Sequence, residues 1–198
     1  MKNIAIFASG SGSNAENLIR YFSAHPQGTV RLVLSNKAEA GAIERAARLG
    51  VESMVFDRDT FYNSEQVLAR LRQERIDFVV LAGFLWLVPD YLIAAYPDRI
   101  VNIHPALLPS FQGAHAIQDA FDYGVKVTGV TVHFANSDYD CGPIIAQRPV
   151  EVEEGWTVDQ LEARIHEVEH EIYPHVAQLL AEGRVHVRED GHVAIVQA

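Results

Sequence analysis

The chain has 198 residues, which is long for one domain and short for two, so a single large core is expected. Its composition, 48% hydrophobic and 21% charged, is typical of a globular protein. A formal net charge of −10 excludes general nucleic-acid or membrane-surface binding, because either function needs a basic face. The one cysteine, Cys141, excludes an internal disulfide and is typical of a reducing compartment.

No apolar run approaches the ~20 residues that a membrane span needs. The chain enters its first predicted strand directly after Met1, which leaves no room for a signal peptide. We therefore expect a cytoplasmic protein.

Apolar strands alternate with helical patterns along the first hundred residues. Strands are predicted over residues 3–8, 29–34, 51–56, 77–81 and 99–103. Helices are predicted after the first strand and over residues 40–49, 63–75 and 89–96. This alternation predicts an α/β fold with a Rossmann-like, doubly wound and mostly parallel sheet.

The second half of the chain adds antiparallel structure to this sheet. A helix over residues 114–123 precedes two strands, 125–134 and 144–152, which we expect to pair antiparallel. A long helix begins at Thr157, and Pro174 is expected to kink or divide it. Residues 185–188 and 192–196 predict a terminal hairpin. No repeat or linker interrupts the pattern, so residues 1–198 are expected to form a single domain.

A glycine-rich turn, Ser9-Gly10-Ser11-Gly12-Ser13-Asn14, joins the first strand to the first helix. Ser13 and Glu16 form a capping-box pattern at the start of that helix. A helix N-terminus after a glycine turn offers free N–H groups to a phosphate. A dinucleotide site would also need an acidic residue ~20 residues further on. The chain has Ser35-Asn36-Lys37 after its second strand, so a single phosphate at Gly12, Ser13 and Asn14 is favoured over a dinucleotide; a turn without a ligand remains the alternative.

Three residues of an acyl-transfer site follow apolar segments between residues 99 and 142. Asn102 and His104 lie on the same side of a predicted strand, because side chains in a strand repeat every second residue. An amide and an imidazole can stabilise an oxyanion, and a carboxylate such as Asp140 can raise the pKa of the imidazole. Each residue also has a purely structural interpretation, as a turn cap, a core histidine or a turn residue before Gly142.

Two other segments invite functional interpretations. The loop Phe84-Leu85-Trp86-Leu87-Val88-Pro89 is apolar enough either to hold a flat organic ring or to tuck into the core. The segment from His166 to His170 matches the zinc motif H-E-x-x-H. Helical geometry, however, places both histidines on the solvent side, and a hydrolytic zinc site needs a partly dry pocket. We therefore expect no metal there, with Glu169 at the edge of the buried stripe, where it can line a cleft.

Six motifs, in this order along the chain, resemble those of the phosphoribosylglycinamide formyltransferase family. They are Ser9-Gly10-Ser11-Gly12-Ser13-Asn14, Ser35-Asn36-Lys37, Leu81-Ala82-Gly83-Phe84, Asn102-Ile103-His104-Pro105-Ala106-Leu107-Leu108-Pro109, Thr131-Val132-His133-Phe134 and Asp140-Cys141-Gly142-Pro143-Ile144-Ile145. With Glu169-His170-Glu171-Ile172-Tyr173-Pro174, the resemblance covers the chain from Ile4 to Pro174. The Asn-x-His and Asp pattern is shared more widely among enzymes that use formyltetrahydrofolate.

The resemblance implies a formyltransferase fold and transfer of a formyl group from 10-formyltetrahydrofolate to the amine of 5'-phosphoribosylglycinamide, without a metal. It implies small-molecule substrates as the only partners of a monomer or homodimer. The implied catalytic residues are Asn102, His104 and Asp140. The implied ribonucleotide-binding residues are Gly12, Ser13, Asn14, Arg58 at the phosphate, Pro105 and Glu169. The implied folate-binding residues are Leu85, Trp86, Leu87, Val88, Asn102, His133, Ala135, Asn136, Ser137, Asp138, Tyr139 and Asp140.

The chain departs from the family pattern at two positions. Trp86 stands where the family more often has Arg or Lys, which removes a direct charge contact to the folate tail and offers a stacking surface in its place. Cys141 stands where a small or hydroxyl residue is commoner. Two alternative functions remain: a formyltetrahydrofolate hydrolase that uses the same three residues on water, and a non-catalytic sugar-phosphate-binding protein.

Overall fold

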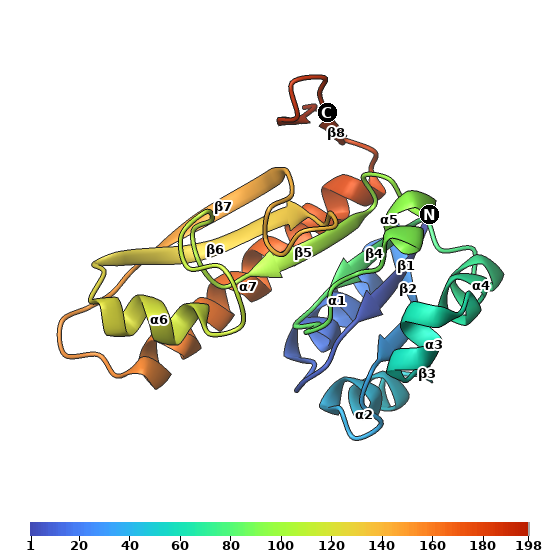
Figure 1. Ribbon diagram of the computed structural model, residues 1–198, viewed down its shortest axis with the longest axis horizontal. Coiled ribbons are helices and arrows are strands. Elements are labelled where there is room, and N and C mark those ends of the chain that lie inside the picture. Colours follow the sequence, from blue (N-terminus) through green and yellow to red (C-terminus); the bar gives the residue numbers. More distant parts are fainter. Residues whose placement is uncertain (198) are drawn as a thin grey trace.

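The computed structural model describes residues 1–197, in which one seven-stranded sheet carries helices on both faces (Figure 1). The strands are β1 (Lys2–Phe7), β2 (Gly28–Ser35), β3 (Glu52–Val55), β4 (Phe78–Leu81), β5 (Ile100–His104), β6 (Val127–Phe134) and β7 (Ile144–Glu151). The helices are α1 (Ser13–Ala24), α2 (Gly41–Arg48), α3 (Arg58–Asn63), α4 (Gln66–Gln73), α5 (Asp90–Ala95), α6 (Ala116–Tyr123) and α7 (Val158–Ala181). A separate antiparallel hairpin, β8 (Val185–Val187) and β9 (Val193–Ile195), follows α7 as predicted.

The strand order is β3-β2-β1-β4-β5-β6-β7. The first five strands in this order are parallel, and β6 pairs antiparallel with both β5 and β7. The predicted doubly wound, mixed sheet is therefore confirmed. The chain leaves β1 toward β3 and returns to β4 on the other side of β1, so a topological switch point lies between the carboxyl ends of β1 and β4, where α/β sheets bind ligands.

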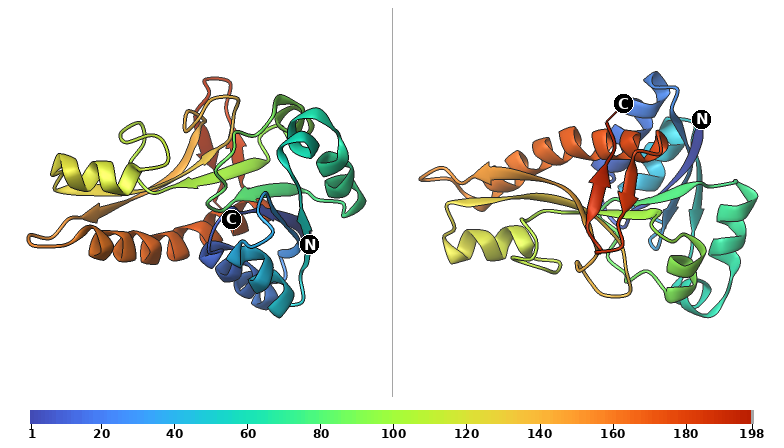
Figure 2. Two further views of the ribbon diagram at one scale, coloured as in Figure 1. Left: turned by 60° about the horizontal axis from the view of Figure 1, so that its bottom comes forward. Right: turned by 90° about the horizontal axis from the view of Figure 1, so that it is seen from above.

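Alternate residues of the buried strands feed two separate cores. Ile4 and Ile6 of β1 pack with α1, α2 and α7 on one face of the sheet. Ala5 and Phe7 pack with α3, α4 and α5 on the other face. Figure 2 shows these two groups of helices on opposite sides of the strands. A central strand that is buried on both faces is read as a continuous apolar run.

The helix predicted over residues 63–75 is wrong at its start. The structure has a short helix, α3, followed by α4 from Gln66. Asp57 caps α3 by accepting a hydrogen bond from the Thr60 N–H at 2.8 Å, and Ser64 is extended between the two helices. The charged residues 57–59, between the predicted strand and the predicted helix, therefore start a helix that the sequence analysis did not predict.

Helix α7 runs through Pro174 without being divided. Proline lacks the N–H that would bond to the carbonyl four residues earlier, which belongs to His170. Asn17 of α1 donates its side-chain N–H to that carbonyl at 2.8 Å, so the orphaned acceptor is satisfied by a neighbouring helix. Within residues 1–197, no helix is long and apolar enough to cross a membrane.

Candidate active site

A cleft of about 550 Å³ opens at the carboxyl ends of β1, β4 and β5. Its walls come from the loops after these strands, the loop between β6 and β7, and α7. The predicted site residues that line it are Gly12, Ser13, Asn14, Leu85, Trp86, Leu87, Val88, Asn102, His104, Pro105, His133, Ala135, Asn136, Asp138, Tyr139, Asp140 and Glu169. Arg58 and Ser137 are the two predicted site residues that do not line it.

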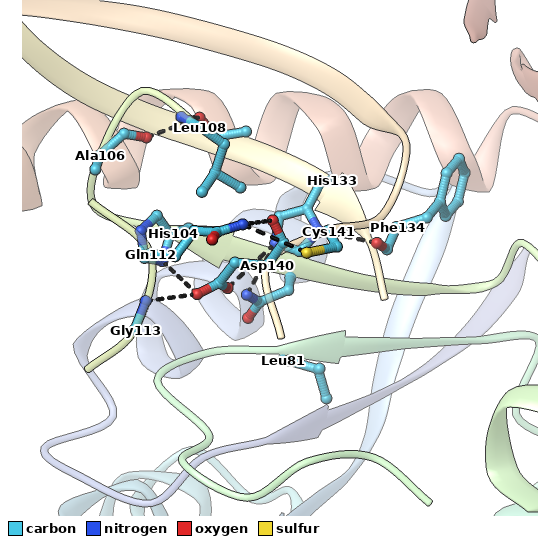
Figure 3. Close-up of polar contacts among 12 residues, drawn as sticks. Leu81, His104, Ala106, Leu108, Gln112, Gly113, His133, Phe134, Asp140 and Cys141 are labelled. Atoms are coloured by element: carbon cyan, nitrogen blue, oxygen red, sulfur yellow. Dashed lines mark hydrogen bonds and ion pairs between the residues drawn. The ribbon is translucent and has the colours of Figure 1, made fainter. Parts of the chain in front are cut away.

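The three predicted catalytic side chains all line this cleft. Figure 3 shows His104, His133 and Asp140 close together. His104 on β5 places its Nδ1 3.4 Å from Oδ2 of Asp140. Asp140 also lies 3.7 Å, through Oδ1, from Nε2 of His133 on β6. Asn102 is directly opposite His133 in the antiparallel register and donates its side-chain N–H to that Nε2 at 3.1 Å. The amide, the two imidazoles and the carboxylate therefore form one connected cluster.

Asp140 is held in place by its loop and by the segment before α6. Its φ of 53° lies in the left-handed region, which Asp tolerates better than most residues. The Gly113 N–H donates to its Oδ2 at 2.9 Å. Two residues later, a side chain at Gly142 would lie 1.7 Å from the Phe134 carbonyl oxygen, so only glycine fits beside the end of β6. The exposed Cys141 lies between them.

The pKa values in the cluster depend on burial as well as on the neighbouring charges. Burial lowers the pKa of His104, and this outweighs the upward effects of Asp140 and of the Phe111 carbonyl, which accepts the Nε2 hydrogen at 2.7 Å. Asp140 therefore raises the pKa of His104 as predicted, but burial makes the net shift downward. Burial would raise the pKa of Asp140, but the imidazole of His133 beside it and the hydrogen bond from the Gly113 N–H lower it overall. A neutral imidazole then faces a carboxylate, and the pair can take up one proton.

The glycine turn packs so tightly against α2 that its backbone is fixed. A Cβ at Gly12, whose φ is 77°, would lie 2.4 Å from the Ala42 Cα. The predicted capping box is wrong: Gly12 is the N-cap of α1, without a side-chain cap, and Ser13 is the first helical residue. Glu16 pairs with Arg20, Arg45 and Arg48 in place of capping. The first N–H groups of α1 thus remain available to an anion.

Asn14 and Glu169 place a buried polar pair beside the glycine turn. Asn14 donates its side-chain N–H to Oε2 of Glu169 at 2.9 Å. Its own Oδ1 is buried without a partner in the described part of the chain. Burial raises the pKa of Glu169. These groups are suited to hydroxyl or amine groups of a ligand whose phosphate lies on the α1 N-terminus.

Helix α7 turns more of its surface inward than the apolar pattern predicts, because Glu169 and Tyr173 are also buried. His166 lines the cleft and both histidines are half-buried, so they are less exposed than the helical pattern predicted. Across residues 1–197, no group of three or more His, Cys, Asp or Glu side chains is arranged to hold a metal ion.

Two hydroxyl groups that sequence reasoning missed connect the strand ends. The Ser9 hydroxyl donates to Oδ1 of Asn36 at 2.7 Å and accepts the Leu85 N–H at 3.1 Å, which joins the loops after β1, β2 and β4. The buried Tyr173 hydroxyl lies 2.7 Å from the Leu81 carbonyl oxygen and 3.1 Å from that of Val101. The available signal was their position inside the family motifs, since neither lies in a pattern that predicts a buried polar contact.

Comparison with known proteins agrees with this geometry. Residues 2–177 match the formyl transferase family model. A phosphoribosylglycinamide formyltransferase from Bacillus subtilis (strain 168) is 40% identical over 185 residues, which cover 91% of this chain and 95% of the relative. One from Escherichia coli (strain K12) is 37% identical over 194 residues, which cover 95% and 91%.

Solved structures extend this similarity to the whole fold. The crystal structure of glycinamide ribonucleotide transformylase 1 from Symbiobacterium toebii has a TM-score of 0.92 and 40% identity, and the match covers 100% of this chain and 95% of that one. That of phosphoribosylglycinamide formyltransferase from Anaplasma phagocytophilum has a TM-score of 0.94 and 35% identity, with 99% and 94% covered. The chain belongs to the formyl transferase family and, within it, to the phosphoribosylglycinamide formyltransferases.

Proposed function

We propose that this protein transfers the formyl group of 10-formyltetrahydrofolate to the amine of 5'-phosphoribosylglycinamide in purine biosynthesis. The products are phosphoribosyl-N-formylglycinamide and tetrahydrofolate. The observation that carries the proposal is the position of the Asn102, His104 and Asp140 cluster in the same cleft as an uncapped helix N-terminus. One cleft therefore holds an acyl-transfer cluster and a phosphate anchor.

The ribonucleotide occupies the α1 end of the cleft in this proposal. Its phosphate binds the N–H groups that follow Gly12, at Ser13 and Asn14. Glu169 binds the ribose hydroxyls or the glycinamide end, and the buried Asn14 Oδ1, which has no partner among the described residues, accepts a hydrogen bond from the ligand. Pro105 lines the cleft directly after the catalytic strand β5.

The folate occupies the other end of the cleft. Leu85, Leu87 and Val88 supply an apolar wall, and residues 135–140 supply backbone groups that suit the polar edge of a pteridine. His133 positions Asn102 rather than touching the donor, because its Nε2 accepts the Asn102 N–H.

The reaction follows from these positions. The substrate amine attacks the formyl carbon, so a C–N bond forms and negative charge develops on the formyl oxygen. Asn102 donates one side-chain hydrogen to His133, which leaves the second for that oxygen. The amine proton passes to the Asp140 and His104 pair, whose imidazolium form the carboxylate stabilises. The proton then moves to N10 of the folate as the bond between N10 and the formyl carbon breaks. No step requires a metal.

The proposal extends to the location, the oligomeric state and the domain organisation of the protein. The acidic charge and single cysteine support a cytoplasmic enzyme, active as a monomer or homodimer, in which residues 1–198 form one formyltransferase domain.

A formyl-transfer assay with and without the ribonucleotide tests the proposal. We expect tetrahydrofolate to form only when 5'-phosphoribosylglycinamide is present. Release of formate without the acceptor would identify a hydrolase instead. Absence of both reactions, with sugar-phosphate binding retained, would identify a binding protein.

A further inference from the structure

We propose that Gln112 is a positioning residue for formyl transfer, because its side-chain amide ties the loop that carries Asp140 to the segment that also binds His104. This inference rests on the proposed function and adds to it a residue outside the cleft. Asp140 and His104 both line the cleft, whereas Gln112 does not. Gln112 therefore acts on the reaction through Asp140 and not through contact with a substrate.

The β6–β7 loop, residues 135–143, leaves the sheet before it reaches Asp140. The Phe134 N–H donates to the Pro143 carbonyl at 2.9 Å, which closes the antiparallel pairing at the base of the loop. Asp140 itself has a φ of 53°, a backbone conformation that needs support from the surrounding contacts. A loop tied at its base alone would let the Asp140 carboxylate move away from His104.

The segment of residues 111–113 holds both members of the proton-transfer pair. The Phe111 carbonyl accepts the Nε2 hydrogen of His104 at 2.7 Å, so the proton taken up in the proposed reaction goes to Nδ1, which faces Asp140. The Gly113 N–H donates to Oδ2 of Asp140 at 2.9 Å. Because one short segment contacts both groups, its position sets the distance of 3.4 Å between the imidazole and the carboxylate.

Gln112 joins this segment to the loop at a second place. Its Nε2 lies 3.2 Å from the Asp140 carbonyl oxygen and 3.4 Å from the Cys141 Sγ, so its two amide hydrogens are donated to successive residues of the loop (Figure 3). The backbone of Asp140 is thereby held by Gln112 while its carboxylate is held by Gly113. Gln112 is exposed, so it contributes these hydrogen bonds and no part of the apolar core.

The segment of residues 111–113 is itself anchored, so a hydrogen bond from it restrains the loop. Shortly before it, the Leu108 N–H donates to the Thr131 hydroxyl of β6 at 3.0 Å, and the Leu108 carbonyl accepts a hydrogen from the Gln147 side chain of β7 at 3.0 Å. Phe111 has a φ of 52°, which a bulky residue rarely adopts, and its ring lies 5.9 Å from that of Tyr123 on α6. These contacts fix the segment against the strands β6 and β7 and against α6.

Steady-state kinetics of Gln112→Ala test the proposal. We expect kcat to fall by about 5- to 20-fold, because the carboxylate is no longer held against His104, while KM for each substrate changes by less than about 2-fold. Gln112→Glu keeps the length of the side chain but cannot donate a hydrogen bond when ionised, so its kcat should fall at least as far. Gln118→Ala is the matched control, since Gln118 is exposed on α6 and donates to Asp122 at 2.8 Å, and its kcat should not change.

A double-substitution cycle separates the positioning of Asp140 from a general effect on the fold. In a protein that already carries Asp140→Asn, Gln112→Ala should lower kcat by less than about 2-fold, because the carboxylate through which Gln112 acts is absent. The full loss in this background as well would overturn the proposal. So would equal kcat values for Gln112→Ala and Gln118→Ala, or an unchanged kcat for Gln112→Glu.

Amide hydrogen exchange followed by NMR tests the contact without the reaction. The Gly113 N–H should exchange about 5- to 20-fold faster in Gln112→Ala than in the unmodified protein, and at the unmodified rate in Gln118→Ala. Equal exchange in all three proteins would overturn the proposal even where formyl transfer is observed. If the unmodified protein transfers no formyl group but the exchange of Gly113 responds as expected, the proposed function fails and Gln112 still positions Asp140.

Discussion

Asp140 is the residue through which the rest of the catalytic cluster is connected, because its two carboxylate oxygens face different imidazoles. Oδ2 lies 3.4 Å from His104 and Oδ1 lies 3.7 Å from His133. The His133 imidazole and the hydrogen bond from the Gly113 N–H keep its pKa low despite burial, so it is a carboxylate at neutral pH. In the proposed reaction it stabilises a positive charge on His104 when the amine loses its proton.

Replacing Asp140 by Asn should lower kcat by roughly 100-fold or more, because the amide cannot stabilise the imidazolium or carry the proton. Asn also tolerates the left-handed φ of 53°, so the fold should survive. Steady-state rates and thermal unfolding of the purified variant measure both effects. The exposed Asp98, with a φ of 52°, provides the matched control Asp98→Asn. Near-normal turnover of the Asp140 variant would refute the assigned role.

Ionisation of the buried Glu169 lowers the stability of the folded protein. Its pKa is raised by burial in the folded protein, so its contribution to stability is fully present below the ordinary carboxyl pKa and is lost as pH rises through the folded value. The nearby His166 opposes this shift and Glu162 adds to it. Glu169→Gln cannot ionise and should exceed the unmodified protein in free energy of unfolding at pH 7.5, by on the order of 1 kcal/mol, with little difference at pH 4.

Urea unfolding of both proteins at the two pH values measures this difference. Glu171→Gln, on the exposed side of the same helix, is the control. The Glu169 variant should also bind the ribonucleotide more weakly. A destabilised variant at pH 7.5 would show that Glu169 serves the fold rather than the ligand.

At the scale of elements, side-chain contacts between α1 and α2 hold the glycine turn where we propose that the phosphate binds. Arg45 of α2 pairs with Glu16 of α1 and also donates its Nε hydrogen to the Ser11 carbonyl at 2.8 Å. Arg48 reaches the same carboxylate at 2.8 Å. These contacts hold the glycine turn against α2.

Arg45→Ala should loosen this turn and raise KM for the ribonucleotide by about 3- to 10-fold, while kcat and KM for the folate change little. Arg20→Ala is the matched control, because Arg20 pairs with Glu16 from within α1 and does not contact the turn. If both substitutions raised KM equally, the cause would be the loss of an ion pair with Glu16. The hydrogen bond from Arg45 to the Ser11 carbonyl would then have no separate effect.

The elements themselves were largely predictable because buried parallel strands are continuous apolar runs and the intervening helices are amphipathic. The errors occur where one particular side-chain contact, rather than the pattern of apolar residues, decides a local structure. Asp57 starts α3 in a charged run, Asn17 supplies the bond that lets α7 continue through Pro174, and Arg45 and Arg48 draw Glu16 away from its cap.

At the scale of the whole molecule, the site could be anticipated because the carboxyl ends of neighbouring parallel strands meet at one edge of a sheet. Strand periodicity alone predicted that the side chains of Asn102 and His104 lie on the same side of their strand. The lowered pKa of His104 could not be predicted, since it depends on burial by segments distant in sequence. The stacking of Arg58 on Trp86 could not be predicted either, because 28 positions separate the two residues in the sequence.

The central claim is that one cleft holds the phosphate of the acceptor at the start of α1 and the reactive carbon of the donor beside Asn102, His104 and Asp140. A crystal structure with 5'-phosphoribosylglycinamide and a non-transferable 10-formyl folate analogue tests it most directly. We predict phosphate oxygens about 3 Å from the N–H groups of Ser13 and Asn14, and the formyl oxygen at hydrogen-bond distance from the Asn102 amide. A phosphate bound away from α1, or a formyl group remote from this cluster, would contradict the account.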